Sequence, residues 1–467
     1  DFAGEEEVGT RRGHALGWRA LGAWAPPDRS AAGRRQRMSP PAAQARATHE
    51  QKEANATQHY NRALASKHRS HAMPLPTAAE RLANIRPFYV MELVKQADAL
   101  RAQGRDMIYL AIGEPDFTAP EVVQRAAIAA MQRGETGYTP ALGLTALREK
   151  IAGFYKTAYG IDLDPKRVIV TAGASGALLL ACAALVGAGD EILMPDPSYP
   201  CNRHFVAAFD GVAKMIPSGP QDRFQLSAQM VRTHWTERTR GVLIASPSNP
   251  TGTSIAHDEL GAIVQEVRAR NGVTIVDEIY QGLAYEDVNP ATGFPRSALE
   301  FGDDVVTINS FSKFFNMTGW RLGWLVVPDA LVPEIEKLNQ NLFICASALA
   351  QHAGLACFTD EALAIYTERR AEFKRRRDFI VPAFEALGLK VPVRPDGAFY
   401  VYADISAHAD DSSAFCARML HEANVVLVPG EDFGTHEPRR YVRASYATAY
   451  TRLEEAVARM QTVLRAR

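Results

Sequence analysis

Hydrophobic positions become regular along this chain near residue 80, and from there they follow two different periods. Before Gly104, apolar residues recur every three or four positions, which is the spacing of one helix face. The glycine is a typical helix stop, and the apolar run over 107–112 predicts a short strand. The positions with helical spacing are Val90, Leu93, Val94, Ala97 and Leu100.

Short continuous apolar runs then recur, most of them separated by helical segments such as "HDELGAIVQEVRARN". An apolar run bounded by turn residues is typical of a strand that is buried on both faces. Alternation of such strands with helices predicts an α/β fold with a mostly parallel central sheet and helices on both faces. The predicted strands are "RVIVTAG", "DEILMPDP", "GVLIASPS", "GVTIVDE", "VVTINS" and "RLGWLVVP".

The pattern changes beyond residue 330, where a long helical stretch precedes a mixed segment with "GAFYVYADI" and "RRYVRASYA". This change predicts a second, smaller α+β domain. We therefore divide the chain into an N-terminal extension, an arm that joins the small domain, a large ligand-binding domain and a small C-terminal domain. Their predicted bounds are residues 1–73, 74–118, 119–329 and 330–467.

Residues 1–73 lack periodicity and are rich in Ala, Arg, Gly and Pro, which predicts a disordered extension. They hold 12 Lys and Arg against 7 Asp and Glu, a net charge of +5, whereas the rest holds 40 against 46, a net of -6. These positive charges are too sparse to favour nucleic acid binding. The run Glu5 to Glu7 argues against a transit peptide, and we expect the working protein to start at Met73.

Composition excludes several classes of protein. The 467 residues are 47% hydrophobic and 22% charged, with a net charge of -1, which is typical of a globular protein. Five cysteines without CxxC spacing argue against a disulfide framework and a zinc site, and favour a reducing compartment. No run approaches 18 apolar residues, so no membrane span is expected. We expect a cytoplasmic protein without a bound metal.

Polar and ionisable side chains follow several of the predicted strands directly. Ligands of open α/β sheets bind beyond the carboxyl ends of the strands, so these residues are candidates for one site. Such a site would suit an anionic ligand with an aromatic, ionisable ring. It would hold the amide-lined helix start in "AGASGAL", with Asn249, Asp277, Tyr280, Ser310 and Lys313.

Lys313 is the least expected of these residues, because it stands among phenylalanines at the end of a buried strand. A buried ammonium group is unfavourable by several kcal/mol unless it is paired, neutral or used covalently. The alternative is a solvated lysine whose stem packs on Phe311 and Phe314.

Five segments in order along the chain decide between these readings: "GYTPALGLTALREKIA", "SPSNPTG", "DEIY", "SFSKFFNMTGWRLGW" and "RASYA". Asn249, Asp277 and Lys313 are separated by gaps of 28 and 36 residues. In order and spacing the segments resemble the class I/II aminotransferase family of fold-type I enzymes, over about residues 80–465. The resemblance implies pyridoxal 5′-phosphate as cofactor, amino acids and 2-oxo acids as substrates, a role in amino-acid metabolism and biosynthesis, and a homodimer.

The resemblance also assigns the catalytic residues. It implies that Lys313 forms a Schiff base with the cofactor and, once freed, acts as the general base. Asp277 would face the pyridine nitrogen and keep it protonated, the alternative being a helix N-cap. Asn249 and Tyr280 would donate to the phenolic oxygen, although Asn249 also suits a turn before Pro250.

Further residues match positions that bind the phosphate, the ring and the substrate in this family. For the phosphate these are Ala174, Ser175, Ser310, Arg321 and, from the neighbouring subunit, Tyr138. Tyr199 would stack on the ring, and Gly113, Asn249 and Arg443 would bind the substrate carboxylate. For most of them there is a structural alternative: a tight turn for the helix start and Gly113, a surface arginine for Arg321, a turn tyrosine for Tyr138 and a strand-edge salt bridge for Arg443.

Transamination by a ping-pong route is the reaction that this set of residues favours, moving an amino group from an L-amino acid to a 2-oxo acid. A carbon–sulfur β-lyase with the same residues is the alternative enzyme, because the fold alone does not give the reaction. A regulator with an inert aminotransferase-like domain would need an N-terminal helix-turn-helix, which residues 1–73 do not suggest. Phe88 and Tyr89 in "IRPFYV" favour a small or apolar amino donor.

Overall fold

A seven-stranded sheet forms the centre of the structure, a computed structural model that describes residues 77–87, 89–286, 288–289 and 292–466. The sheet is parallel except for β8, which runs antiparallel to both of its neighbours. The predicted mostly parallel sheet is therefore confirmed. In spatial order the strands are β2 (Val168–Thr171), β8 (Gly323–Val326), β7 (Val306–Ser310), β6 (Val273–Asp277), β5 (Thr239–Ala245), β3 (Glu191–Asp196) and β4 (Val212–Pro217).

Strand β4 was not predicted from the sequence, whereas each of the other six strands overlaps a predicted run. It lies at the edge of the sheet and pairs only with β3 among the described strands. Most of its residues are exposed or half-buried, so "VAKMIP" lacks the continuous apolar run that marks the central strands. An edge strand needs less apolar surface, and its signal is weaker for that reason.

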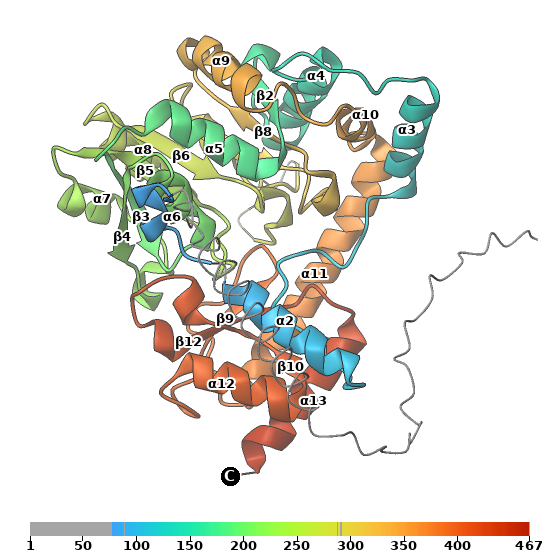
Figure 1. Cartoon of the computed structure of the whole chain (residues 1–467), viewed down its shortest axis with the longest axis vertical. Helices are drawn as coiled ribbons and strands as arrows, with labels where there is room; N and C mark the ends of the chain where they lie inside the picture. The colour runs from blue at the N-terminus through green and yellow to red at the C-terminus, as the bar shows by residue number, and fades with distance from the viewer. Residues whose placement is uncertain (1–76, 88, 287, 290–291, 467) are drawn as a thin grey trace, which may run out of the picture. The chain divides into compact units, whose positions relative to one another are not determined.

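Both faces of the sheet are buried, and successive residues of one strand serve opposite faces. On β5, Leu243 packs with residues of α5 (Gly173–Leu185), whereas Val242 and Ile244 pack with α7 (Ala228–His234) and α8 (His257–Arg268). Figure 1 shows α5 lying across the sheet. The remaining helices around it are α3 (Glu121–Gln132), α4 (Thr145–Phe154), α6 (Pro200–Ala207), α9 (Val332–Leu342) and α10 (Ala348–Ala356).

A smaller antiparallel sheet of three strands has the order β11–β12–β9. A two-stranded parallel pair joins β1, early in the chain, to β10, late in the chain. Helix α2 packs by Val90, Leu93 and Ala97 against residues of this C-terminal part. The elements are α2 (Tyr89–Ala102), β1 (Ile108–Tyr109), α11 (Asp360–Ala386), β9 (Tyr400–Asp404), α12 (Ser412–Arg418), β10 (Val425–Val426), β11 (Val428–Pro429), β12 (Tyr441–Ser445) and α13 (Tyr450–Arg465).

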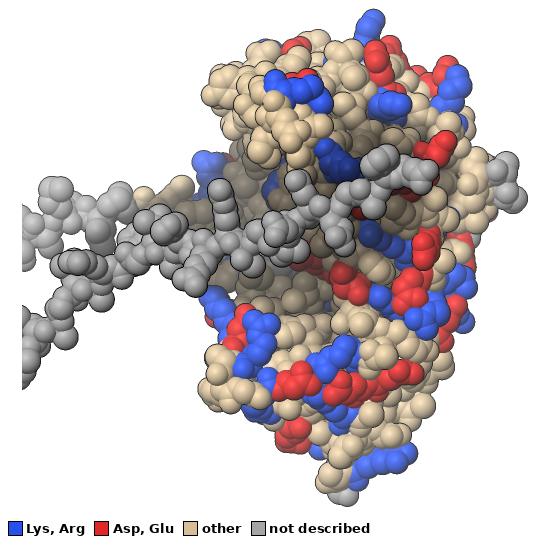
Figure 2. All heavy atoms as spheres, turned by 90° about the vertical axis from the view of Figure 1, so that its right-hand side faces the viewer, with Lys and Arg blue, Asp and Glu red and all other residues tan. Residues whose placement is uncertain are grey.

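Residues Ala78–Arg467 group into one unit, so the division into an arm, a large and a small domain stays a prediction. The predicted disorder of residues 1–73 lies outside the described residues. No helix in the described part of the chain is long and apolar enough to cross a membrane. On the face in Figure 2, basic and acidic side chains lie intermixed, and the surface is hollowed between its upper and lower parts.

Gly323 lets strand β8 approach the start of helix α5. A Cβ atom at this position would lie 2.7 Å from the carbonyl carbon of Gly173 and 2.8 Å from the nitrogen of Ala174. Both atoms belong to the backbone, which cannot move aside as a flexible side chain can. The turn between β2 and α5 therefore depends on a glycine in the neighbouring strand.

We predict that Gly323→Ala displaces the start of α5 and lowers the free energy of unfolding by about 1–3 kcal/mol, the usual effect of overpacking. Gly319→Ala is the matched control, because a Cβ there would meet nothing within 4 Å. Thermal and urea unfolding of both variants measure the difference. Equal stability of the two variants would show that the close approach at Gly323 is unimportant.

Candidate active site

One cavity of about 320 Å³ lies where the carboxyl ends of the central strands meet the start of α5. It brings together residues from the large sheet, from β9 and β12 and from α2, which are far apart in the sequence. Among the residues predicted from sequence, those in its wall are Gly113, Ala174, Ser175, Tyr199, Asn249, Asp277, Tyr280, Lys313, Arg321 and Arg443. Ser310 and Tyr138 are not among the wall residues.

Lys313 follows strand β7 and points its amine into the cavity. Its Nζ donates a hydrogen bond to the carbonyl oxygen of Gly113 and lies 5.8 Å from the ring centres of Tyr280 and Phe399. Burial lowers the pKa of Lys313 to about 8, and the positive charges of Arg321 and Arg443 act in the same direction. Glu114 and Asp277 oppose the shift. A large neutral fraction is therefore accessible just above neutral pH.

Asp277 is the last residue of β6, and its carboxyl group is buried, with 5% of the residue exposed. Burial raises the pKa of Asp277 to about 6, while a hydrogen bond from the Ile279 N–H, at 3.0 Å, and the charge of Lys313 oppose the rise. The helix-cap alternative is wrong, because no α-helix begins here: a short 3₁₀ turn follows, and its N-cap is Tyr280. A cation in the cavity would stabilise this carboxylate.

Arg443 presents a buried guanidinium group to the cavity, with 2% of the residue exposed. It donates from Nη1 to Asn249 Oδ1 at 2.9 Å and from Nη2 to the carbonyl oxygen of Ala111. Its Nε has no hydrogen-bond partner among the described residues, where Arg443 forms no ion pair with a carboxylate. The salt-bridge alternative is therefore not what the structure describes. A buried cation with a free donor suits an incoming carboxylate.

The start of α5 and Arg321 form the second polar end of the cavity. Ala174 and Ser175 lie in the first turn of this 13-residue helix, where backbone N–H groups favour anions. Arg321 is exposed and donates from Nη1 to the carbonyl oxygen of Thr318 at 3.1 Å. A Cβ on Gly173, whose φ is +73°, would lie 2.7 Å from Arg321 Nη2. Glycine at 173 thus allows the guanidinium to approach the helix start.

Ser310, which is predicted to bind the phosphate, is not among the residues of the cavity wall. Its hydroxyl donates to Ser312 Oγ at 2.9 Å and to the Leu322 carbonyl oxygen at 3.2 Å. Ser312, two residues along, is the serine in the cavity wall. The reason is local: Ser310 still belongs to strand β7, so its hydroxyl is engaged in the joint between β7 and β8.

Tyr400 is a site residue that the sequence analysis missed. Its hydroxyl lies 2.7 Å from that of Tyr280, and its ring lies 4.7 Å from the Arg443 guanidinium carbon. A Cβ on Gly113 would lie 2.5 Å from the Tyr400 hydroxyl, which explains the need for glycine at 113. The segment "GAFYVYADI" predicted a strand, but only its pairing with β12 brings Tyr400 beside Arg443.

Helix α2 supplies an apolar wall to the cavity through Val90, Met91 and Val94. The predicted contact by Tyr89 is not seen, since Tyr89 is exposed and absent from the cavity wall, and Phe88 lies outside the described residues. The helix begins at Tyr89, so its periodicity turns later residues toward the cavity. Among the described wall residues the cations are Lys313, Arg321 and Arg443.

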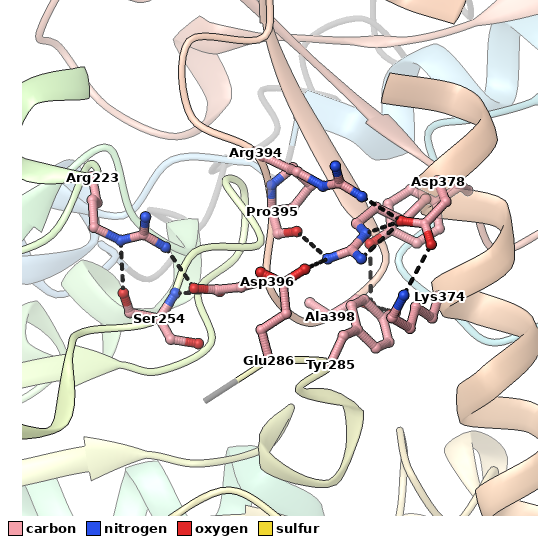
Figure 3. Close-up of polar contacts among 12 residues, drawn as sticks. Arg223, Ser254, Tyr285, Glu286, Lys374, Asp378, Arg394, Pro395, Asp396 and Ala398 are labelled. Carbon is pink, nitrogen blue, oxygen red and sulfur yellow. Dashed lines mark hydrogen bonds and ion pairs between the residues drawn. The ribbon is translucent and has the colours of Figure 1, made fainter. Parts of the chain in front are cut away.

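Ser254, a few residues beyond Asn249, is attached to Asp396 in the chain that leads into β9 (Figure 3). Asp396 accepts hydrogen bonds from the Ser254 N–H at 2.8 Å and from Arg223, and the N–H groups of Asp396 and Gly397 both donate to the Gly252 carbonyl oxygen at 3.0 Å. These bonds hold Asn249 in register with the strand that carries Tyr400.

Tyr199 and Tyr138 differ in their surroundings. Tyr199 lies at the start of α6 in the cavity wall, and burial raises the pKa of its hydroxyl well above the usual value. Tyr138 is 85% exposed and outside the wall, so its role across a subunit interface stays a prediction. Among the described residues, no group of three His, Cys, Asp or Glu is placed to hold a metal ion.

Residues 105–460 match the family described as aminotransferase class I and II. A valine–pyruvate aminotransferase from Mycobacterium tuberculosis is 40% identical over 381 residues, 81% of this chain and 96% of that protein. A probable aspartate/prephenate aminotransferase from Aquifex aeolicus is 33% identical over 397 residues, 83% of this chain and 98% of that protein.

Solved structures agree with these relatives. A crystal structure of an aminotransferase from Mycobacterium tuberculosis has a TM-score of 0.80 and 39% identity, and covers 84% of this chain and 100% of its own. Aspartate aminotransferase from Thermus thermophilus with maleate has a TM-score of 0.78 and 33% identity, with coverage of 83% and 100%.

We predict that Lys313 in the ligand-free protein reacts with an acylating reagent at a rate that rises with pH and levels off above about pH 8. Its lowered pKa supplies the neutral amine there, whereas an unperturbed lysine has a pKa of about 10.4. Peptide mapping after brief exposure to the reagent at several pH values measures the midpoint. The peptide with exposed Lys337 is the reference. A midpoint for Lys313 near that of the reference peptide would contradict the effect of burial.

Proposed function

This chain belongs to the class I and II aminotransferases, which depend on pyridoxal 5′-phosphate, and we propose that it moves the amino group of an uncharged L-amino acid to a 2-oxo acid by a ping-pong route. The observation that carries the proposal is the buried guanidinium of Arg443, with a free Nε, in the same cavity as the amine of Lys313. The guanidinium suits a substrate carboxylate. The amine suits a covalent link to the cofactor and proton transfer at the amino carbon of the substrate.

The residues present fit the cofactor. When bound, pyridoxal phosphate supplies an aldehyde that links to an amine and a ring that accepts electrons from the amino carbon. The start of α5 with Ser175 and Arg321 suits the phosphate. Asp277 would hold the proton of the pyridine nitrogen, since its carboxylate is buried and open to a cationic partner. Tyr199 would pack on the ring.

Lys313 carries the covalent and proton-transfer roles in this proposal. Its Nζ would hold the cofactor through the aldehyde and, when free, would be the base that takes the proton from the substrate Cα. The pKa of about 8 supports this role, because a base works best when its pKa is near the working pH. Tyr280 and Asn249 would donate hydrogen bonds to the phenolic oxygen.

Arg443 would bind the substrate α-carboxylate, with Asn249 and the Gly113 backbone beside it. The substrate side chain would then point toward the apolar wall of α2. In this proposal each of the three cations of the described wall has a partner. Arg321 would bind the phosphate, Lys313 would hold the cofactor, and Arg443 would bind this carboxylate. No described cation remains for a second carboxylate, which favours substrates with uncharged side chains in both half-reactions. The name of the valine–pyruvate relative supports the same class.

A carbon–sulfur β-lyase would use the same lysine and aspartate, and it remains the alternative reaction. Transamination is favoured because the similar proteins with 33–40% identity are named aminotransferases. The two reactions differ in their products: a lyase acting on cysteine consumes water and releases pyruvate, sulfide and ammonia without needing an oxo-acid acceptor.

We also propose a homodimer in which Tyr138 reaches the phosphate of the neighbouring subunit, and a cytoplasmic location. Exposure of Tyr138 in its own chain supports the first proposal. The five free cysteines support a reducing compartment.

We predict that Lys313→Ala lowers the rate of transamination by about 10²–10⁴-fold or more, because both the covalent link and the base are lost. Borohydride reduction of the parent enzyme should place the cofactor on the peptide with Lys313. Lys337→Ala, at an exposed lysine paired with Glu334, is the control and should retain full activity. Labelling of a different lysine in the parent enzyme would contradict the assignment.

We predict that alanine and valine react faster than aspartate in the first half-reaction, by about tenfold or more at equal concentration, since a pocket that leaves a charge unpaired rejects it. The change in cofactor absorbance on mixing with each amino acid measures the rates. Met91→Arg places a cation on the cavity wall and should reduce the difference in rate between aspartate and the two uncharged amino acids. Val212→Arg, on edge strand β4 outside the wall, is the control and should leave this difference in rate unchanged. Preference of the parent enzyme for aspartate would contradict the proposed substrate class.

We predict that mixing inactive Tyr138→Ala chains with inactive Lys313→Ala chains recovers activity. Each mixed dimer would hold one site in which both lesions are absent, if Tyr138 acts across the interface. Analytical ultracentrifugation and a tagged-subunit exchange assay establish that mixed dimers form. Absence of recovered activity despite exchange would show that Tyr138 acts within its own chain or not at all.

A further inference from the structure

Two loops face each other across the cavity beside the amine of Lys313. We call residues 113–118 the carboxylate loop and residues 313–318 the lysine loop. The Lys313 amine donates to the Gly113 carbonyl oxygen, and the Thr318 hydroxyl donates to the Glu114 carboxylate. The position of the amine relative to the proposed carboxylate site therefore depends on how firmly the loops are joined.

Arg369 on helix α11 contacts both loops at once, behind the cavity. Its Nη1 donates to the Thr118 carbonyl oxygen at 2.6 Å and to Asn316 Oδ1 at 2.8 Å. Its guanidinium carbon lies 5.0 Å from the centre of the Phe117 ring. Arg369 is absent from the cavity wall, so its contacts are to the loops and not to the site itself.

Asn316 transmits this contact to Lys313. It is 3% exposed, and its Nδ2 and backbone nitrogen donate to the Lys313 carbonyl oxygen at 3.0 and 3.2 Å. A closed ring results: from Arg369 through Asn316 to Lys313, across its amine to Gly113, and along the chain to Thr118. Cutting one contact of the ring would leave the loops joined by fewer bonds, among them the bond from Thr318 to Glu114.

A second arginine supports the carboxylate loop from the same face of α11. Arg376, seven residues beyond Arg369, donates from Nη1 to Asp116 Oδ1 at 2.7 Å, and its guanidinium carbon lies 5.2 Å from the Phe117 ring centre. Only Arg369, of these two, also contacts the lysine loop. It therefore adds a bridge from α11 to the two direct bonds between the loops.

We propose that Arg369 is a positioning residue for the reaction: through Asn316 and the Thr118 carbonyl it holds the Lys313 amine at its working distance from the Gly113 backbone. A guanidinium group suits this role, because its rigid, planar set of donors can serve two oxygens and still stack on an aromatic ring. The role in catalysis rests on the proposed function of Lys313, whereas the holding of the loops does not.

The test compares Arg369→Met with Arg375→Met in the full chain loaded with pyridoxal phosphate. Arg375 is on the same helix but contacts Glu372 and Tyr450 and neither loop. Misplacement of about 1 Å slows a reaction by up to about a hundredfold. Arg369→Met should therefore lower the half-reaction rate at saturating amino acid by about tenfold or more, with the half-saturating concentration changed less than about threefold. Arg375→Met should match the parent enzyme.

Hydrogen exchange of the ligand-free protein gives a readout that is independent of activity. Arg369→Met should speed exchange in residues 113–118 and 313–318 and leave strands β6 and β7 as protected as in the parent protein. A uniform rise across the chain would indicate a general loss of stability and overturn the proposal. Arg369→Lys keeps a cationic donor and should recover part of both effects; if it behaved as Arg369→Met does in both, charge and donation at this position would be irrelevant.

Asn316→Gly tests the same ring from the other side, because Asn316 has a φ of +53°, which glycine adopts without strain. Each single variant should slow the half-reaction, and the double variant should be little slower than either, since one cut already opens the ring. Additive losses, or rates within twofold of the parent enzyme in both single variants, would overturn the role of Arg369. A parent enzyme without any half-reaction would instead count against the proposed function, and the exchange comparison would still decide whether Arg369 joins the loops.

Discussion

The partial burial of the Lys313 amine, at the end of strand β7, is the constraint on which the rest of the site depends. Burial lowers its pKa to about 8, and the same enclosure raises the pKa of Asp277 to about 6. Both shifts bring the pKa values of these groups toward neutral pH from opposite sides.

Keeping charged groups enclosed requires that the walls of the cavity stay in place. The Asn249 turn is bonded to the chain before β9 through Asp396, and the carboxylate and lysine loops are bonded to α11 through Arg369. Glycines at 113, 173 and 323 allow backbone and side chains to approach closely where a Cβ would collide. The polar groups that face the cavity are thus supported by bonds from residues that never reach it.

Sequence reasoning succeeded where the chemistry is local. Continuous apolar runs predicted the central strands, and the residues immediately after them, such as Asp277 and Lys313, were correctly predicted to converge. The sequence was less informative where a neighbouring element determines which way a side chain points. Ser312 and not Ser310 faces the cavity, because Ser310 is still engaged in strand β7, and edge strand β4 lacked an apolar signal. Tyr89 begins a helix whose periodicity turns Val90 and Met91 inward instead.

The sequence by itself determined the class of fold, the family and the ten predicted residues that line the cavity, since period, turn chemistry and spacing are properties of adjacent positions. Only the tertiary structure decided which side chains meet. Tyr400 contacts Tyr280 across 120 residues, and Arg369 lies 251 residues from Thr118. Contacts of this kind follow from how the two sheets and helix α11 pack together, and packing is a property of the whole folded chain that no local pattern encodes.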